Sequence, residues 1–299
     1  MGQHTAYHGT KVAKESLLDI IIRLNPYDNW FFNNSGDSTA KQSTHEWNYD
    51  ALTAPAAKAA VEGADITTTT EADFTRVQNS CQLIQVHGAL SKSMMADDSA
   101  GTSNIKGYYM EKKMIELKGH AEYAFLVNSA EVTGTSAAGR QLKGVQGFIA
   151  NTASATATGI DLTATLFNNV LQEVWADMGG TSFEVLCGGY QKRIISAFTG
   201  NTRNITAEAK KNVQVINVYE SDFGVCNIHL SVVMNANTPA EVYIFGDFAN
   251  MWKKAWKRKP ERYDLATLGS AERFAIECEV TLEARNGSSG GWVKTNKSS

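Results

Sequence analysis

Two short segments carry residues that could bind phosphate or act as a nucleophile. GTSAAGRQ (134–141) has two glycines at the spacing of a phosphate-binding loop, but Arg140 and Gln141 stand where that loop needs Lys and Ser or Thr. SNIK (103–106) matches the S-x-x-K pattern of a serine nucleophile, yet the companion S-D-N and K-T-G motifs are missing. Ser103 is better explained as a helix N-cap. These segments predict neither nucleotide binding nor hydrolysis, and we expect no cofactor.

The histidines and cysteines are too scattered to predict a metal site or a redox pair. No C-x-x-C pair occurs, and the histidines do not stand with carboxylates at metal-ligand spacing. We expect the cysteines to be buried, reduced thiols that pack as small hydrophobic groups. An enzyme built on residues 161–200 is a rival hypothesis that no motif supports. The residues concerned are His4, His8, His45, His87, His120 and His229, with Cys81, Cys187, Cys226 and Cys278.

WKKAWKRKPERY (252–263) is the strongest concentration of positive charge, with six basic residues against one acid. Trp252 and Trp256 at i,i+4 predict an amphipathic helix that ends at Pro260. One interpretation is a peripheral protein that binds nucleic acid or a membrane surface through this helix. The other buries the tryptophans and leaves the lysines in solvent or against a neighbouring subunit. We favour the second, with a candidate contact patch of Lys253, Lys254, Lys257 and Arg258, because the segment is short and the chain is acidic.

Composition predicts a folded, soluble protein. Of 299 residues, 43% are hydrophobic and 20% are charged, and the formal net charge of −3 argues against nucleic-acid binding by overall charge. No apolar run approaches the length of a membrane span. The first residues lack the apolar core of a signal peptide, so we expect a cytoplasmic product.

The first part of the chain predicts an arm followed by a long hairpin. A short helix at 14–24 leads into a polar stretch with embedded aromatic residues. HEWNYDAL (45–52) then alternates with period 2, and a second extended run at 73–91 answers it across a tip of small residues. An isolated hairpin is only marginally stable in water. Since no sheet is apparent nearby, we expect another copy of the chain to cover its aromatic side.

The remaining elements predict an α+β protein. Residues 97–129 form the clearest helix, nearly 40 Å long at about 1.5 Å per residue, with a Lys118–Glu122 pair on its solvent side. A Gly-rich connector (131–151) leads to a helix at 161–178, a strand at 182–188 and a helix at 190–200. Strand-like runs dominate from 212 to 287, and a Gly/Ser tail ends the chain.

This order of elements resembles the major capsid proteins of tailed phages, which have the Hong Kong 97-type fold. Three segments are similar to one uncharacterised-domain family of phage major head proteins. They are H-E-W-x-x-D-x-L with a later E-G-A, R-x-x-x-G, and T-L-E-x-x-N. The matching residues are His45, Glu46, Trp47, Asp50, Leu52, Glu62, Gly63, Ala64, Arg140, Gly144, Thr281, Leu282, Glu283 and Asn286. One departure is Asn25-Pro26-Tyr27, where the family often has Thr-Pro-Phe.

The resemblance implies a self-assembling subunit, not an enzyme, that forms hexamers and pentamers of an icosahedral shell around double-stranded DNA. The implied domains are an N-terminal arm (1–40), an extended E-loop hairpin (41–95), a peripheral domain with a spine helix (96–150), an axial α/β domain (151–210), and long strands returning to both (211–299). Portal, scaffold or decoration proteins are the further partners, and no membrane is involved. The implied location is the virion, assembled in the host cytoplasm. Arm and E-loop residues expected at inter-subunit contacts are Trp30, His45, Glu46, Trp47, Tyr49, Asp50, Leu52 and Glu62.

Overall fold

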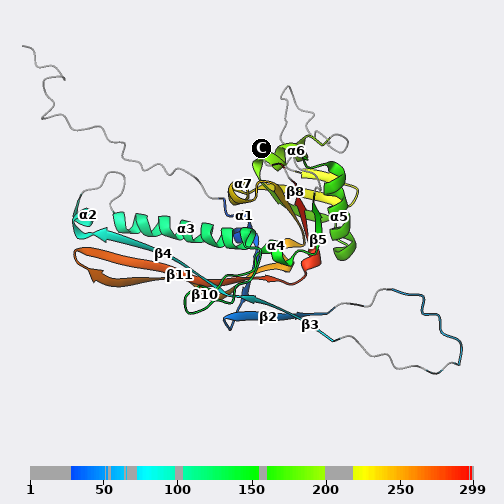
Figure 1. Ribbon diagram of the computed structural model, residues 1–299, viewed down its shortest axis with the longest axis horizontal. Coiled ribbons are helices and arrows are strands. Elements are labelled where there is room, and N and C mark those ends of the chain that lie inside the picture. Colours follow the sequence, from blue (N-terminus) through cyan, green and yellow to red (C-terminus); the bar gives the residue numbers. More distant parts are fainter. Residues whose placement is uncertain are drawn as a thin grey trace, which may run out of the picture.

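The computed structural model describes residues 28–50, 52, 55–63, 65, 73–97, 104–154, 160–198, 218–295 and 297. The predicted helix at 14–24 and the predicted cap Ser103 lie outside these residues. The body is elongated because a long helix and three long strands run side by side, and a hairpin projects from it (Figure 1). The described residues form two larger sheets and one two-stranded sheet, and the mixture of helices and strands confirms the α+β prediction.

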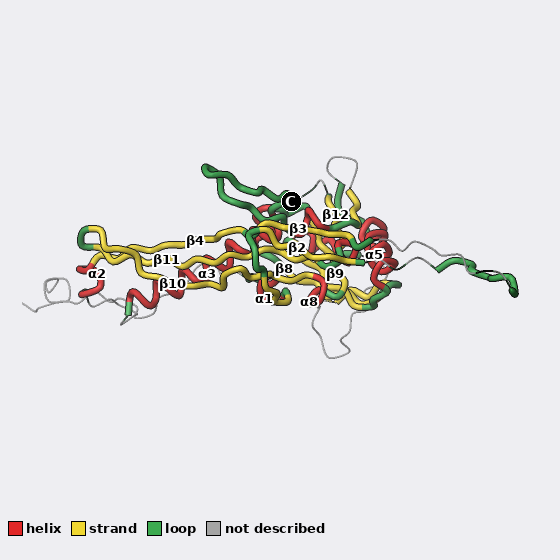
Figure 2. The backbone as a smooth tube through the Cα atoms, turned by 90° about the horizontal axis from the view of Figure 1, so that it is seen from below, coloured by secondary structure: helices red, strands yellow, loops and turns green. Residues whose placement is uncertain are grey.

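A four-stranded sheet forms the long part of the body. Its order is β1-β10-β11-β4, with β1 parallel to β10 and the other neighbours antiparallel. The strands run lengthwise, as the view from below shows (Figure 2). Their bounds are β1 (Gly36–Thr39), β4 (Gln82–Ser91), β10 (Trp252–Leu268) and β11 (Ala271–Ala284).

The long helix α3 (Ile105–Val127) covers one face of this sheet. Asn104 caps it, since its side chain accepts a hydrogen bond from the N–H of Gly107 at 2.8 Å. Ala121, Ala124 and Phe125 of α3 are buried against the sheet. The sheet contributes alternate residues to the same core. These are Ile84, Val86, Leu90, Phe274, Ile276, Cys278, Val280 and Leu282.

A six-stranded sheet forms the second part of the body, with order β5-β12-β9-β6-β8-β7. Helices α5 (Ala164–Met178) and α6 (Gly189–Ser196) pack on one face and bury residues such as Phe167 and Val170. Thr163 caps α5, since its hydroxyl oxygen accepts a hydrogen bond from the N–H of Leu166 at 3.2 Å. The strands are β5 (Asn151–Ser154), β6 (Ser182–Cys187), β7 (Val218–Ser221), β8 (Gly224–Leu230), β9 (Glu241–Gly246) and β12 (Gly290–Lys294).

Short elements join these parts of the body. They are α1 (Trp30–Asn34), α2 (Lys92–Ala96), α4 (Val145–Phe148), α7 (Val232–Asn237), α8 (Phe248–Met251) and the 3-10 turn η1 (Gly287–Ser289). The Gly/Ser segment near the C-terminus is therefore a turn followed by β12, and the prediction of a tail was wrong for residues 288–294. Hydrogen bonds to β9 and β5 order these residues.

The predicted helix at 252–263 was also wrong, because these residues belong to strand β10. Trp252 and Trp256 are buried in the core that the sheet shares with α3. Pro260 lies where the register between β10 and β11 shifts, between Arg258 and Glu261, so its missing N–H interrupts no regular ladder. The hypothesis of a peripheral protein that binds nucleic acid or a membrane surface depended on an amphipathic helix, which this segment does not form.

The predicted hairpin exists, but its second strand is shorter than expected. β2 (Thr44–Tyr49) pairs with β3 (Thr75–Ser80), and these two strands form a sheet of their own. The run at 73–91 divides at Cys81, after which β4 joins the four-stranded sheet. We call β2 and β3 the distal hairpin. All four cysteines are buried free thiols, as predicted.

Candidate functional site

The base of the distal hairpin rests on its own subunit. The ring Nε2 of His45 lies 3.0 Å from Oε2 of Glu283, and the indole N–H of Trp47 donates to the carbonyl oxygen of Ala284 at 3.0 Å. Trp47 also packs on Phe148 with ring centroids 5.8 Å apart. The expectation that a second copy must cover the aromatic side is therefore corrected at His45 and Trp47, where β11 and α4 provide the contact.

Asn79 fixes the other strand of the hairpin and is fully buried. Its side-chain oxygen accepts from the N–H of Lys143 at 2.8 Å, and its amide nitrogen donates to the carbonyl oxygens of Lys143 and Leu282, both at 2.9 Å. Because the oxygen and the nitrogen of this buried amide both have hydrogen-bond partners, any displacement of Asn79 would leave buried polar groups without partners. The position of the strand relative to Lys143 and Leu282 is therefore fixed. Next to it, the hydroxyl of Ser80 donates to Glu131. We call His45, Trp47, Asn79 and Ser80 the hairpin seat.

The electrostatics of the seat favour an ionised Glu283. Burial alone would raise its pKa, but His45, Ser38 and the guanidinium of Arg285 together outweigh burial and lower the pKa to about 2. Arg285 Nε lies 2.7 Å from the second carboxylate oxygen. Glu283, a residue of β11, is thus an anion at neutral pH, held between His45 of the hairpin and Arg285.

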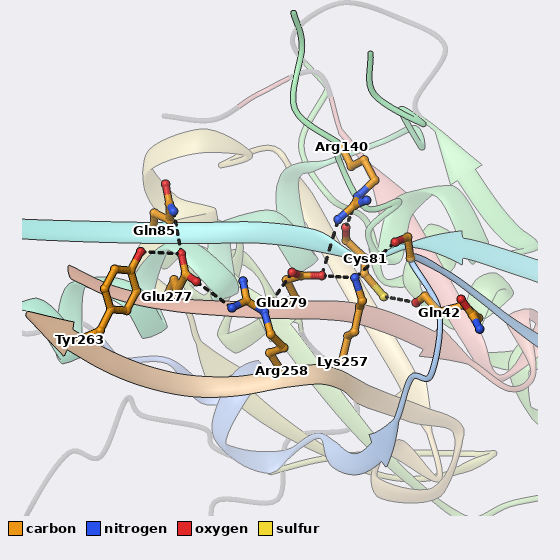
Figure 3. Close-up of polar contacts among 10 residues, drawn as sticks. Gln42, Cys81, Gln85, Arg140, Lys257, Arg258, Tyr263, Glu277 and Glu279 are labelled. Carbon is orange, nitrogen blue, oxygen red and sulfur yellow. Dashed lines mark hydrogen bonds and ion pairs between the residues drawn. The ribbon is translucent and has the colours of Figure 1, made fainter. Parts of the chain in front are cut away.

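A second polar cluster lies beside the seat, where the hairpin joins the four-stranded sheet (Figure 3). Lys257 Nζ lies 2.7 Å from Oε2 of Glu279 and donates to the hydroxyl of Ser43 at 3.2 Å. Arg140 lies 3.5 Å from the same Glu279 oxygen and donates from Nε to the carbonyl oxygen of Cys81 at 3.1 Å. We call these five residues the junction cluster.

A β-bulge explains why two consecutive cations reach the same carboxylate. Trp256 pairs with Val280 and Arg258 pairs with Glu279, so Lys257 is an extra residue on β10. In a regular strand, Lys257 and Arg258 would point to opposite faces, whereas a bulge turns neighbouring side chains toward one side. Arg258 Nε accordingly lies 3.0 Å from Oε1 of Glu279.

The network continues along the sheet through Glu277. This carboxylate accepts hydrogen bonds from Gln85 at 2.7 Å, Arg258 at 2.7 Å and Tyr263 at 3.0 Å. The Gln85 amide, followed by Arg258 and Tyr263, outweighs the effect of burial and lowers the pKa of Glu277. For Glu279, burial raises the pKa, but Lys257 and Arg258 together make the net shift a lowering. Both acids therefore carry charge at neutral pH.

The structure places the predicted basic patch mainly in intramolecular contacts. Lys254 is buried, and its ammonium donates to the carbonyl oxygen of Ser35 at 2.6 Å. Lys257 and Arg258 are paired with the two glutamates described above. An open patch of four basic side chains is therefore not present on β10, and its use as one contact surface was a wrong expectation at Lys254.

The predicted contact residues of the arm and hairpin divide into two groups. Trp30 stacks on His229 at 4.3 Å between ring centroids and contacts Phe248, so it joins α1 to the six-stranded sheet of its own subunit. Like His45 and Trp47, it makes its described contacts within the chain. The residues that remain exposed are Glu46, Tyr49, Asp50, Leu52 and Glu62.

The three segments that carried the sequence resemblance meet at this site. His45 and Trp47 contact Glu283 and Ala284 at the end of β11, the strand that also contains Thr281 and Leu282. Arg140 belongs to the junction cluster. Gly144 is required by a close approach, since a β-carbon there would lie 2.5 Å from the carbonyl oxygen of Phe125. Sequence analysis missed Asn79, Lys143 and Cys81, because their roles depend on partners far along the chain.

Other kinds of site find no support in the described part of the chain. Within those residues, no group of three or more His, Cys, Asp and Glu side chains is arranged to hold a metal ion. Nor does any described helix combine the length and apolar character that crossing a membrane requires.

Comparisons with known proteins agree with this architecture. A family model described as SU10 major capsid protein matches residues 3–297. The structure is similar to the capsid of a native GTA particle (TM-score 0.70, 11% identity, 99% of this chain and 100% of that chain). It is also similar to the capsid of cyanophage A-1(L) (0.68, 10%, 98% and 100%) and of Myoviridae phage XM1 (0.64, 9%, 98% and 99%). These likenesses confirm the Hong Kong 97-type fold. No curated protein sequence matches the chain.

Proposed function

The chain belongs to the SU10 major capsid protein family, and from this premise we propose how it builds a shell. It is a major capsid protein of the tailed-phage type and hence a component of the virion. In our proposal, it assembles in the host cytoplasm as hexamers and pentamers of an icosahedral shell. Its role is structural, without catalysis, and its partners are copies of itself together with portal, scaffold or decoration proteins.

The observation that carries this proposal is the exposure of the hairpin tip, which is the segment between Tyr49 of β2 and Thr75 of β3. Leu52 is 98% exposed, Val61 is 79% exposed and Phe74 is 67% exposed, although all three are apolar. Beyond Tyr49 and Thr75, the described residues of the tip pair with no other strand. Exposed apolar side chains that gather on one projection mark a contact site. In the proposal, the hairpin reaches over a neighbouring subunit and buries this tip there.

The two larger sheets support an assignment of the axial and peripheral domains of the subunit. We assign the six-stranded sheet with α5 and α6 to the axial domain around the five-fold and six-fold axes. The four-stranded sheet with α3 is assigned to the peripheral domain. Strand β12 then belongs to the axial domain, although it comes from the C-terminal end of the chain. Each subunit touches several neighbours, so individually modest interfaces sum over a closed lattice.

The charge of the chain fits a container for DNA. A formal net charge of −3 gives no overall attraction to phosphates. A strongly basic wall would bind duplex DNA at any sequence and restrict its movement. We propose that the shell encloses double-stranded DNA without gripping it.

Size-exclusion chromatography and negative-stain microscopy of the expressed chain test the proposal. It predicts hexamers, pentamers or closed shells. A strictly monomeric protein at high concentration would overturn it, as would turnover of a substrate at a pocket of the six-stranded sheet.

A further inference from the structure

The distal hairpin is connected to the body by two chain segments that lie side by side. Residues 40–43 join β1 to β2, and Cys81 joins β3 to β4. The N–H of Cys81 donates to the carbonyl oxygen of Ser43 at 2.7 Å. Any rotation of the hairpin relative to the four-stranded sheet must therefore pass through these two connections.

Each connection is held by a different cation of the junction cluster. Lys257, from β10, donates to the hydroxyl of Ser43, and Arg140, from the connector after α3, donates to the carbonyl oxygen of Cys81. Both cations also approach one oxygen of Glu279, at 2.7 and 3.5 Å. Glu279 of β11 thus binds both cations, and each cation binds one of the two chain segments that lead to the hairpin (Figure 3).

Glu279 is suited to this task by its surroundings. Its side chain is only 10% exposed, and Arg258 holds its other oxygen at 3.0 Å. A mostly buried carboxylate with several charged partners has few alternative positions, because moving it leaves cations unpaired. The bulge at Lys257 serves the same geometry, since it turns the ammonium toward Glu279 and Ser43.

We propose that Glu279 is a positioning residue that fixes the angle at which the distal hairpin leaves the subunit. It acts through Lys257 and Arg140, which hold the two connections at Ser43 and Cys81. The inference rests on the proposed role of the hairpin as an inter-subunit arm, because its angle matters when the tip must meet a neighbouring copy.

Glu277 provides a matched control. It lies on the same strand and face as Glu279 and shares Arg258 with it, but it contacts neither Ser43 nor Cys81 nor Arg140 among its described partners. If both glutamates only stabilised the sheet, Glu277→Gln and Glu279→Gln would change the exchange of the hairpin amides to the same extent. If Glu279 positions the hairpin, only Glu279→Gln changes the exchange of these amides.

Hydrogen–deuterium exchange of the full chain, at a concentration below the onset of assembly, separates these cases. In Glu279→Gln, we expect the amides of Cys81 and of β2 and β3 to exchange about tenfold faster, while those of α3 and β12 are unchanged. Glu277→Gln is expected to leave the hairpin amides at the wild-type rate. Lys257→Met, which retains Arg140 and Arg258 on Glu279, is expected to affect the amides near Ser43 and provides a second measurement if Glu279→Gln does not fold.

Shell yield from the same preparations is the second readout, and it is expected to fall for Glu279→Gln but not for Glu277→Gln. Unchanged exchange at Cys81 in both Glu279→Gln and Lys257→Met would overturn the positioning role. Equal acceleration in the two glutamate variants would do so as well. Failure of the wild-type chain to form shells would overturn the proposed function instead, and the exchange comparison would still decide the role of Glu279.

Discussion

Glu122 accepts a hydrogen bond from the backbone N–H of Phe32 at 2.6 Å, although the two residues are 90 positions apart in the sequence. Its other carboxylate oxygen accepts from the N–H of Phe31 at 3.1 Å. Both donors belong to the first turn of α1, so a side chain of the spine helix α3 provides acceptors for N–H groups at the start of a helix. This contact joins the end of the arm to the long helix, and Glu122 is fully buried there.

The stability of the subunit is expected to depend on pH through Glu122. Burial raises the pKa of this carboxyl to about 7 from an ordinary value of 4.5, and Asp28 adds to the rise, although the two N–H donors oppose it. Between these pH values, the folded chain keeps a proton that the unfolded chain releases. The free energy of unfolding therefore falls as the pH rises through this window, by up to about 3 kcal/mol.

Urea unfolding of wild type and Glu122→Gln between pH 4.5 and 7.5 checks this prediction. The glutamine cannot ionise and keeps one acceptor oxygen, so its free energy of unfolding lacks this part of the pH dependence. Identical slopes for the two proteins would contradict the account of Glu122.

The hairpin seat predicts a large effect for Asn79→Ala. The substitution leaves the N–H and carbonyl oxygen of Lys143 and the carbonyl oxygen of Leu282 without their partner in a buried place. We expect a loss of about 2–4 kcal/mol in the free energy of unfolding. Asn48→Ala, at an exposed position of the same hairpin, is the control and should change stability by less than about 0.5 kcal/mol. Equal stabilities of the two variants would show that the seat is not formed.

The sequence predicted the hairpin but not the seat, and the reason is physical. Alternation over residues 45–50 reports only that one side of a strand is apolar, not which surface covers it. Asn79 has no local signal, because an asparagine in a polar strand looks the same whether it faces solvent or Leu282. The signal that could have located the seat was present in the segments that contain Trp47, Arg140 and Glu283, which the fold brings together.

Two misassigned features have similar causes. Trp252 and Trp256 are four residues apart, a spacing that fits one face of a helix and also one face of a strand, since four is an even number. The strand is selected by pairing with β11, where Ala284 and Val280 lie opposite Trp252 and Trp256 although both partners are outside the segment that carries the pattern. Lys118 and Glu122 stand at the spacing of a surface ion pair on a helix, but α1 packs over Glu122 and takes it out of solvent. In both cases, tertiary contacts override a local pattern.

Substitution of Lys254 tests whether the basic residues of β10 stabilise the subunit or bind nucleic acid. Its ammonium binds the carbonyl oxygen of Ser35 and lies 3.4 Å from a carboxylate oxygen of Asp37. Lys254→Met is expected to lower the free energy of unfolding by about 1–3 kcal/mol because Ser35 and Asp37 lose this partner. Lys259→Met, at an exposed position of the same strand, should have little effect. Retention of the chain on duplex DNA should be equal for both variants and wild type, and a selective loss in either would revive the binding hypothesis.

The exposed tip predicts a defect in assembly without a defect in folding. Leu52→Asp combined with Val61→Asp places two charges where a neighbouring subunit is proposed to bury apolar groups, and burying an unpaired charge is strongly unfavourable. We expect a subunit with wild-type thermal stability that forms no closed shells in microscopy. Lys58→Gln, on the same exposed tip, is the matched control and should assemble. Normal shells from the double variant would show that the tip is not part of the interface between subunits.

A cryo-electron microscopy reconstruction of the assembled particle tests the central claim most directly. The account predicts a closed shell in which the hairpin base contacts β11 of its own subunit through His45 and Trp47, while Leu52 and Val61 are buried against a neighbouring copy. A tip that folds back onto its own subunit, or a chain that forms no closed particle, would contradict it.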